Sequence, residues 1–236
     1  MIEDHIDLDY SLHSPPQPTV GVVVLQTDEV LEDELRVWLS NDTRLLHTRI
    51  PSHAEVNTDT LSTMEAALPA SLSLLPSTAP LSVIAYGCTS ASTVIGEARV
   101  EAIVQEQFPE VKVTNPLTAL KAQLDHLGVR KLALLTPYEP IVSEALRSNL
   151  TDHGVDVVSF GTFNEPLDSN VCRIDEASIK HAIKRLHDET HCDAVFASCT
   201  NLRTAGWIDA YSKELGTVVI SSNSAMSWHI NHLLSN

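Results

Sequence analysis

The chain has 236 residues, of which 15 are lysine or arginine and 31 are aspartate or glutamate, so its formal net charge is −16 at pH 7. A chain of this length can bury a large core, as one large domain or as two of about 100 residues each. The sequence holds no basic cluster that could replace phosphate counterions, which excludes nucleic acid as an expected partner. Small anions stay possible substrates, because backbone N–H groups can make a site locally positive.

The first 18 residues, MIEDHIDLDYSLHSPPQP, are acidic and then proline-rich. A signal peptide has the opposite character, basic and then apolar, so we predict a flexible arm over residues 1–18. The apolar runs elsewhere are much shorter than the roughly 20 residues that span a bilayer, and we expect no membrane contact. A cytoplasmic location with reduced cysteines is the expectation that follows.

Beyond the arm, short aliphatic or β-branched runs alternate with segments of helical periodicity, such as residues 28–40. The runs predicted as strands are residues 19–25, 44–50, 81–87, 111–114, 131–136, 155–160, 193–198 and 217–222. Continuous apolar strands separated by helices are typical of a parallel sheet that is covered on both faces. The fold class is therefore α/β.

Three landmarks recur at a nearly constant offset of about 110 residues, which indicates an internal repeat. They are the apolar pair Val22 and Leu134, the thiol pair Cys88 and Cys199, and the amide pair Asn115 and Asn223. The repeat predicts two pseudo-symmetric three-layer domains with parallel sheets and an active site in the cleft between them. We assign residues 19–115 and 222–236 to the first domain and residues 116–221 to the second, because the apolar C-terminal segment needs a surface to cover.

Two similar stretches end predicted strands, VIAYGCTSAS at residues 83–92 and AVFASCTNLR at residues 194–203. Ligands of open α/β sheets bind beyond the carboxyl ends of the strands, where Cys88 and Cys199 lie. If a helix begins at each cysteine, its N–H groups and dipole favour the thiolate. Free cysteine also packs well as a small buried hydrophobe. The matched pair favours two catalytic thiols that face each other across one cleft.

Polar residues near these strand ends are candidates for binding a substrate. Hydroxyl and amide side chains that follow the cysteines can meet a carboxylate or can merely cap helices, and both interpretations stay open. A tyrosine in LLTPYEP lies on the same expected edge of the second half, and an asparagine follows the last strand. These candidates are Thr89, Ser90, Thr200, Asn201, Tyr138 and Asn223.

Other sites are less well supported. The segment HAIKRLHDETHC carries histidines at positions 181, 187 and 191 and a cysteine at 192, but zinc ligands on one helix face need a spacing of three or four. We interpret Cys172 and Cys192 as structural thiols. No phosphate-binding glycine loop and no G-x-S-x-G motif is present. We therefore expect neither a metal nor a cofactor.

The sequence resembles the Asp/Glu racemase superfamily, in its maleate isomerase and arylmalonate decarboxylase branch. The stretches that carry the resemblance are GVVVLQTDE, AYGCTSAS, LLTPY, CRID, ASCTNLRT and VVISSNSAMSWH. They extend over roughly residues 19–230, and the paired Cys-Thr motifs with the intervening TPY are fairly specific to this branch. Within the branch, the chain resembles the ectoine-utilisation proteins.

The resemblance implies a cofactor-independent enzyme of two similar α/β domains, and we expect a homo-oligomer that acts on a small carboxylate or amino acid. In maleate isomerases of this kind, the thiolate matching Cys88 adds to one alkene carbon and the thiol matching Cys199 protonates the other. In the racemases, one thiolate removes an α-proton and the opposite thiol returns a proton. The decarboxylases have glycine at the first position, whereas this chain keeps Cys88.

Asp28 departs from the pattern of the branch. Maleate isomerases typically carry an asparagine after the first strand that holds a substrate carboxylate, and this chain has LQTDE there. A carboxylate would repel a dicarboxylate unless it is protonated, but it could pair with an ammonium group. Asp28 could equally be a cap of the helix that follows. If Asp28 contacts the substrate, an amino acid or another nitrogen-bearing acid is favoured over maleate.

Three functions are therefore retained from the sequence. The leading one is a two-cysteine isomerase or racemase that acts on a small carboxylic acid. The first alternative is a non-catalytic or regulatory binder of small carboxylates with the same fold. The second is a decarboxylase of the arylmalonate type. The retained pair of cysteines favours the isomerase, because a binder has no need of two thiols that face one ligand.

Overall fold

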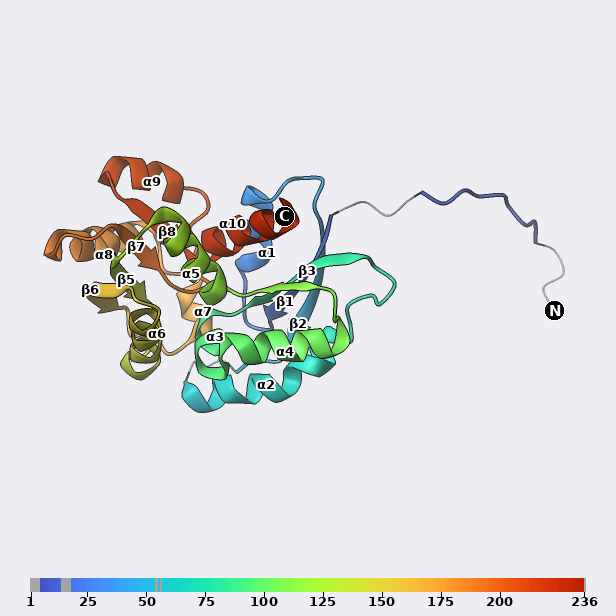
Figure 1. Cartoon of the computed structure of the whole chain (residues 1–236), viewed down its shortest axis with the longest axis horizontal. Helices are drawn as coiled ribbons and strands as arrows, with labels where there is room; N and C mark the ends of the chain where they lie inside the picture. The colour runs from blue at the N-terminus through green and yellow to red at the C-terminus, as the bar shows by residue number, and fades with distance from the viewer. Residues whose placement is uncertain (1–4, 14–17, 54, 56, 236) are drawn as a thin grey trace.

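The computed structural model describes residues 5–13, 18–53, 55 and 57–235, and it contains two four-stranded parallel sheets (Figure 1). The first sheet is formed by β1 (Thr19–Leu25), β2 (Arg44–Ile50), β3 (Leu81–Gly87) and β4 (Lys112–Thr114). The second is formed by β5 (Lys131–Thr136), β6 (Asp156–Thr162), β7 (Ala194–Ala197) and β8 (Val218–Ser221). Each predicted strand overlaps one of these.

Both sheets have the same strand order, β2-β1-β3-β4 in the first and β6-β5-β7-β8 in the second. The predicted repeat is therefore a repeat of topology, in which β3 corresponds to β7. The two cysteine motifs follow these corresponding strands. The predicted α/β fold with two similar parallel-sheet halves is confirmed.

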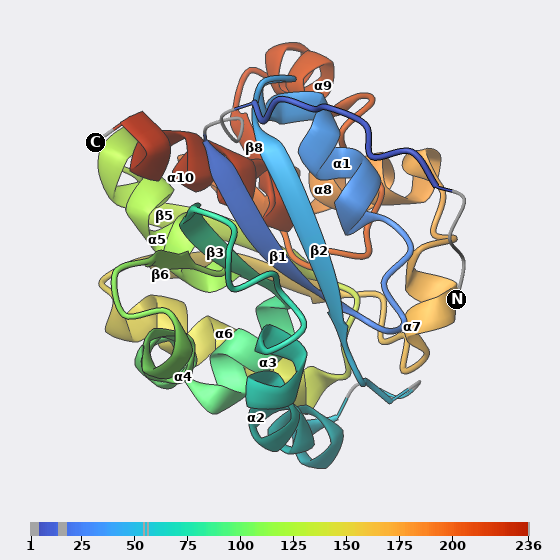
Figure 2. The ribbon, with the colours of Figure 1, turned by 90° about the vertical axis from the view of Figure 1, so that its right-hand side faces the viewer.

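The helices between the strands cover the sheets. In the first half they are α1 (Leu31–Trp38), α2 (Thr58–Leu72), α3 (Thr89–Ile95), α4 (Glu97–Gln107) and α5 (Pro116–Leu127). In the second half they are α6 (Pro140–Asp152), α7 (Asp168–Val171), α8 (Glu176–Glu189), α9 (Ile208–Leu215) and α10 (Ser222–Ser235). Figure 2 shows the first sheet between α1 and α10 on one side and α2, α3 and α4 on the other.

The side chains of β1 alternate between two apolar cores, one on each face of the first sheet. Val22 and Val24 are buried in one apolar cluster with residues of α1, α5 and α10, whereas Val23 is buried in a second cluster with residues of α2 and α4. Successive side chains of a strand point to opposite faces of the sheet. The uninterrupted valine run therefore reflects a strand that is buried on both sides.

The C-terminal helix α10 returns to the first half of the molecule. It packs against α5, α1 and the strands β3 and β4, and the Lys112 ammonium group donates to the carbonyl of Leu233 at 2.7 Å. Helix α5 shares its apolar cluster with both β1 and β5. The exact domain boundaries after residues 115 and 221 stay predictions, because α5 belongs to the core of both halves.

The ends of α5 show how the sequence defines a helix in this fold. Asn115 accepts hydrogen bonds from the N–H groups of Leu117 and Thr118 at 3.0 Å, and Pro116 occupies the first turn. Gly128 ends the helix with a left-handed φ of 69°. A polar cap, an N-terminal proline and a C-terminal glycine are the standard signals for helix boundaries.

Residues 5–13 precede the sheets and contain no helix or strand. Their apolar side chains are exposed, at Ile6, Leu8, Tyr10 and Leu12. Figure 1 shows this segment running away from the folded part of the chain. Within the described residues, no helix combines the length and apolar character that crossing a membrane requires.

Gly87, the last residue of β3, provides a test of the packing beneath Cys88. A Cβ at this position would lie 2.2 Å from Cδ2 of Leu31 and 3.0 Å from the carbonyl oxygen of Val23. We expect Gly87→Ala to lower the free energy of unfolding by about 1–3 kcal/mol, as overpacking of a buried site does. Gly206→Ala is the matched control, because a Cβ there meets nothing within 4 Å. Urea unfolding measures both, and equal stability of the two variants would contradict the prediction.

Candidate active site

A small cavity lies where the carboxyl ends of β1, β3, β5 and β7 meet, and residues of both halves line it. The centre of a water molecule can occupy a volume of about 20 Å³ within this cavity. Seven of the nine residues predicted from the sequence belong to the lining, namely Asp28, Cys88, Thr89, Ser90, Tyr138, Cys199 and Thr200. The structure therefore brings the two cysteine motifs, 111 positions apart in the chain, to one enclosed site.

Cys88 caps the helix that follows β3. Its backbone is extended, and its Sγ accepts a hydrogen bond from the N–H of Ala91 at 3.3 Å. The hydroxyl of Ser90 lies 3.5 Å from the same sulfur. The side chain is only 4% exposed. Helix α3 thus begins directly after this thiol, as the sequence predicted.

Cys199 occupies the corresponding end of β7 but has a different backbone. Its φ is +121°, a conformation that L-residues rarely adopt and that costs of order 1–3 kcal/mol. Its Sγ accepts from the N–H of Asn201 at 3.4 Å. The expectation that a helix begins at Cys199 is wrong, since the chain forms turns after it and α9 begins only at Ile208.

The protonation of the thiols also differs from the expectation. Burial raises the pKa of Cys88 to about 12, despite the lowering effects of Ser90 and the Ala91 N–H. Burial also raises the pKa of Cys199 well above its usual value. The charges of Asp168 and Asp28 raise the pKa of both thiols further. Burial and these charges therefore keep both cysteines as neutral thiols at pH 7.

Hydroxyl groups connect the two halves around the thiols. Ser222, the first residue of α10, lies 2.8 Å from the Thr89 hydroxyl and accepts from the N–H of Cys199 at 2.9 Å. Thr200 donates to the carbonyl of Gly87 at 3.4 Å. Thr200 thus contacts the opposite half directly and Thr89 contacts it through Ser222, so both threonines have a structural role as well as a place in the lining.

Tyr138 is buried at the start of the loop after β5. Its hydroxyl accepts a hydrogen bond from Ser198 at 3.4 Å. Burial raises the pKa of Tyr138 well above its usual value, while Tyr138 in turn lowers the pKa of Cys199. The tyrosine is therefore a neutral hydroxyl beside the second thiol.

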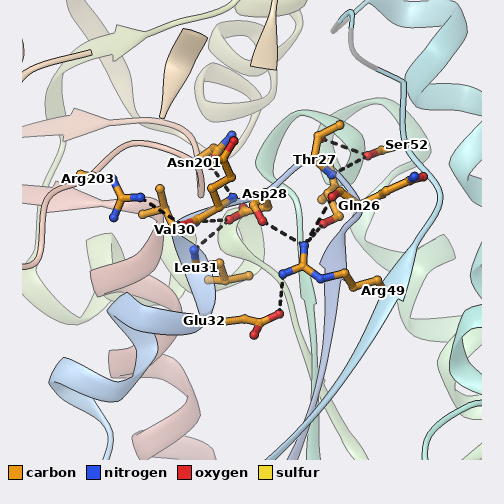
Figure 3. A network of polar contacts seen from close by, with 12 residues as sticks. Gln26, Thr27, Asp28, Val30, Leu31, Glu32, Arg49, Ser52, Asn201 and Arg203 are labelled. Atoms are coloured by element: carbon orange, nitrogen blue, oxygen red, sulfur yellow. Dashed lines mark hydrogen bonds and ion pairs between the residues drawn. The ribbon is translucent and has the colours of Figure 1, made fainter. Parts of the chain in front are cut away.

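Asp28 combines the two roles that the sequence left open (Figure 3). Its Oδ1 accepts from the N–H groups of Val30 and Leu31, both at 2.8 Å, and so caps α1. Its Oδ2 is buried and has no hydrogen-bond partner among the described residues. The Arg49 guanidinium donates to the Asp28 carbonyl at 2.9 Å and pairs with Glu32 rather than with this carboxylate. Burial raises the pKa of Asp28.

Two predicted binding residues, Asn201 and Asn223, do not reach the cavity lining. The Asn201 amide accepts from the N–H of Glu29 at 2.9 Å and donates to the carbonyl of Asp168 at 3.1 Å. The Asn223 amide donates to Glu34 and to the carbonyl of Thr200, both at 2.8 Å. Their side chains hold loops of the two halves together, and a role of Asn201 and Asn223 in binding substrate stays a prediction.

The sequence did not indicate Asp168, which also lines the cavity. It begins the short helix α7, and its Oδ2 accepts from the Thr27 hydroxyl at 2.5 Å. Burial raises the pKa of Asp168, and the charge of Asp28 contributes in the same direction. The repeat could have indicated this region, because the segment after β2 also reaches the lining through Ser52 and His53.

Glu34 is a second acidic residue that the sequence did not reveal. It lies on α1, is 5% exposed and accepts hydrogen bonds from a loop of the second half and from α10. The N–H of Thr204 and the N–H of Ala205 donate to Oε1, while the Thr204 hydroxyl (3.0 Å) and the Asn223 amide (2.8 Å) donate to Oε2. Four donors around two oxygens match an acceptor-only carboxylate.

Metal ligation has no candidate among the described residues, where no group of three His, Cys, Asp or Glu side chains is placed to hold an ion. All four cysteines, Cys88, Cys172, Cys192 and Cys199, are free thiols. Of these four, Cys88 and Cys199 line the cavity.

Glu34→Gln tests the contact between the halves. The substitution replaces one acceptor oxygen by an amide N–H donor, which would then face the N–H or O–H donors around Glu34. We expect the free energy of unfolding to fall by about 1–3 kcal/mol, the cost of leaving a buried group unpaired. Glu32→Gln is the matched control, because Glu32 pairs with Arg49 at the surface and such pairs contribute at most about 1 kcal/mol. Thermal or urea unfolding measures the stability of both variants. A smaller loss of stability in Glu34→Gln than in Glu32→Gln would contradict the prediction.

The raised pKa of Cys88 predicts slow alkylation of the empty enzyme. A group with a pKa of about 12 is almost wholly protonated at pH 8, whereas a free cysteine is partly thiolate. We expect Cys88 to react with iodoacetamide about 100-fold or more slowly than free cysteine, with a rate that rises about tenfold per pH unit. Mass spectrometry of timed samples measures the rate, and fast alkylation with a plateau near pH 7 would contradict the prediction.

Residues 78–236 match the arylmalonate decarboxylase family. Among curated proteins, the maleate isomerase of Alcaligenes faecalis is 22% identical over 231 residues, which cover 92% of this chain and 90% of that protein. The maleate isomerase of Geobacillus stearothermophilus is 26% identical over 156 residues, covering 63% of this chain and 62% of that protein.

Solved structures of such proteins share the fold described above. A Nocardia farcinica maleate cis-trans isomerase, a mutant with a covalently bound succinylcysteine intermediate, superposes with a TM-score of 0.84 at 23% identity over 92% of each chain. A liganded mutant of arylmalonate decarboxylase superposes with a TM-score of 0.82 at 23% identity over 93% of this chain and 94% of the other. With two thirds of its length matched by the family, the chain belongs to the arylmalonate decarboxylase family.

Proposed function

We propose that the protein is a cofactor-independent isomerase, a racemase or a cis-trans isomerase, that acts on a small carboxylic acid through Cys88 and Cys199. The observation that carries the proposal is that two buried thiols at corresponding strand ends line one small cavity. Two thiols from opposite halves can reach opposite faces of one small molecule. The curated relatives named maleate isomerase support the same reaction class.

As a racemase, the enzyme would use the thiols as acid and base. One thiolate removes the α-proton, the electron pair passes into the carboxylate as an enediolate, and the opposite thiol returns a proton to the other face. The α-carbon ends with inverted configuration, and one proton has moved from one sulfur to the other. Hydroxyl donors stabilise the charge that develops on the carboxylate, and Ser90 and Tyr138 are such donors in the lining.

As a cis-trans isomerase, the enzyme would use one thiol as a nucleophile. Cys88 first loses its proton to solvent, and the resulting thiolate forms a bond to one alkene carbon while Cys199 gives its proton to the other. Rotation about the resulting single bond and expulsion of the sulfur, with return of the proton to Cys199, release the trans acid. The succinylcysteine intermediate of the Nocardia farcinica enzyme is an adduct of this type.

The alternatives make less use of the site. The decarboxylases of the branch have glycine at the first cysteine position, and this chain has Cys88 there. A binding protein would gain nothing from burying two thiols in one cavity. The strained backbone of Cys199, with φ of +121°, is also typical of a functional residue.

The proposal predicts that Cys88→Ser and Cys199→Ser each lower kcat by at least about 100-fold, because a serine hydroxyl is a far weaker acid than a thiol. Sulfur and oxygen differ little in volume, so the free energy of unfolding should change by less than about 1.5 kcal/mol. Cys172→Ser is the control and should retain turnover. Chromatography identifies the reaction, with a chiral column for aspartate, glutamate, hydroxyaspartate and diaminobutyrate derivatives and an achiral column for maleate and its trans isomer. Near-normal kcat in either active-site variant would refute the two-thiol mechanism.

A further inference from the structure

We propose that Asp28 and Asp168 hold a cationic nitrogen group of the substrate, and that the arrival of this positive charge makes the neighbouring thiols reactive. The inference rests on the proposed function for the role of the thiols, and it narrows the substrate to a short acid that carries an ammonium or similar group. A simple dicarboxylate such as maleate is then a poor ligand.

The first observation is the unpartnered oxygen of Asp28. The residue is 3% exposed, and its Oδ1 already accepts two N–H groups, whereas its Oδ2 is buried without a partner. A buried acceptor left unpaired is costly. The Thr200 hydroxyl beside it donates to the Gly87 carbonyl, and Arg49 is committed to carbonyl oxygens and Glu32. The interaction with the Thr200 hydroxyl lowers the pKa of Asp28, but that hydroxyl donates to Gly87, so Oδ2 of this cavity-lining residue is a buried acceptor to which a ligand donor can bind.

The second observation is the charge of the cavity lining. Asp168 is 5% exposed, lines the same cavity and interacts electrostatically with Asp28. Among the described residues of the lining there is no lysine or arginine, and the remaining ionisable groups are His53, Glu55, Cys88, Cys199 and Tyr138. Arg49 lies behind Asp28 and outside the lining, so on the cavity side the two buried carboxylates attract a cation and repel a second anionic group.

The third observation connects this charge to the thiols. Asp28 and Asp168 both raise the pKa of Cys88 and of Cys199, so their negative charge opposes formation of a thiolate. A cation between the two carboxylates removes that opposition and offers the thiolate a counter-charge. The ammonium group brings one positive charge to the two aspartates and one proton leaves a thiol for solvent, while the carboxylate of the ligand keeps its own charge among the hydroxyl donors of the lining, so no other reactant is needed.

Calorimetric titration with matched probes tests the cation site without requiring turnover. The probes are 2-aminobutyrate and 2,4-diaminobutyrate, with 2-hydroxybutyrate and maleate as counterparts that lack nitrogen. We expect the nitrogen-bearing acids to bind at least about 10-fold more tightly than their counterparts. Asp28→Asn should weaken the nitrogen-bearing acids by about 10- to 150-fold, the factor for a hydrogen bond to a charged group, and should leave maleate unchanged or improve it.

The alkylation rate of the ligand-free variants is a second measurement. Here the aspartate substitutions should increase the measured quantity, whereas they should decrease the affinity for nitrogen-bearing acids. Asp28→Asn and Asp168→Asn each remove a negative charge from beside the thiols, so iodoacetamide should modify Cys88 and Cys199 at least about 3-fold faster than in the unmodified protein. Asp175→Asn is the matched control, because Asp175 caps α8 at the surface by accepting from the N–H of Ser178 at 2.7 Å. It should change neither affinity nor alkylation.

Two results would overturn the inference. One is equal affinity of 2-aminobutyrate and 2-hydroxybutyrate in the unmodified protein. The other is a preference for nitrogen that Asp28→Asn and Asp168→Asn leave unchanged. If either result is found and Cys88→Ser and Cys199→Ser lose turnover, the proposed cation site is rejected and the proposed isomerase function is retained. Retained turnover in both cysteine variants, with a cation preference that depends on Asp28, removes the isomerase mechanism and keeps the cation site.

Discussion

The buried carboxylate of Glu34 is the contact on which the geometry of the site depends. It comes from α1 of the first half and accepts from Thr204 and Ala205 of the second half and from Asn223 of α10, so the turn after Cys199 is fixed by α1 of the opposite half. A helix starting at Cys199 would use the N–H groups of Thr204 and Ala205 within itself. Because Glu34 accepts those groups instead, the turn is held open and α9 begins later. The interface between the halves thus determines the local backbone at the second thiol.

This asymmetry within a symmetric fold is consistent with two thiols that have different roles. The strand order of the two sheets is identical, yet Cys88 caps a helix with an extended backbone while Cys199 sits at positive φ. Their surroundings differ in the same way, with the Ser90 hydroxyl near Cys88 and Tyr138 near Cys199. Duplication supplies two similar positions, and contacts between the halves then make them chemically unequal, as a nucleophile and an acid need to be.

The sequence predicted those features that are recorded in local patterns. Apolar runs placed the strands, the recurring Cys-Thr motif paired β3 with β7, and both thiols proved to line one cavity. It did not reveal that Asn201 and Asn223 bind Glu29 and Glu34, and it missed Asp168. Hydrogen bonds between residues far apart in the chain leave no periodicity to read, so a polar residue after a strand looks the same whether it meets a substrate or a distant loop.

The balance of charge and burial explains how the thiols can react with a bound substrate and yet resist oxidation. A thiolate is the form that oxidises, whereas a protonated buried thiol is comparatively inert. Burial and the two aspartates keep Cys88 and Cys199 protonated. An acidic lining therefore has a consequence beyond selecting a ligand, because it couples the reactivity of the thiols to occupancy of the cavity. A neutral amide at position 28 would bind a dicarboxylate more easily, but it would leave the reactivity of the thiols less dependent on the substrate.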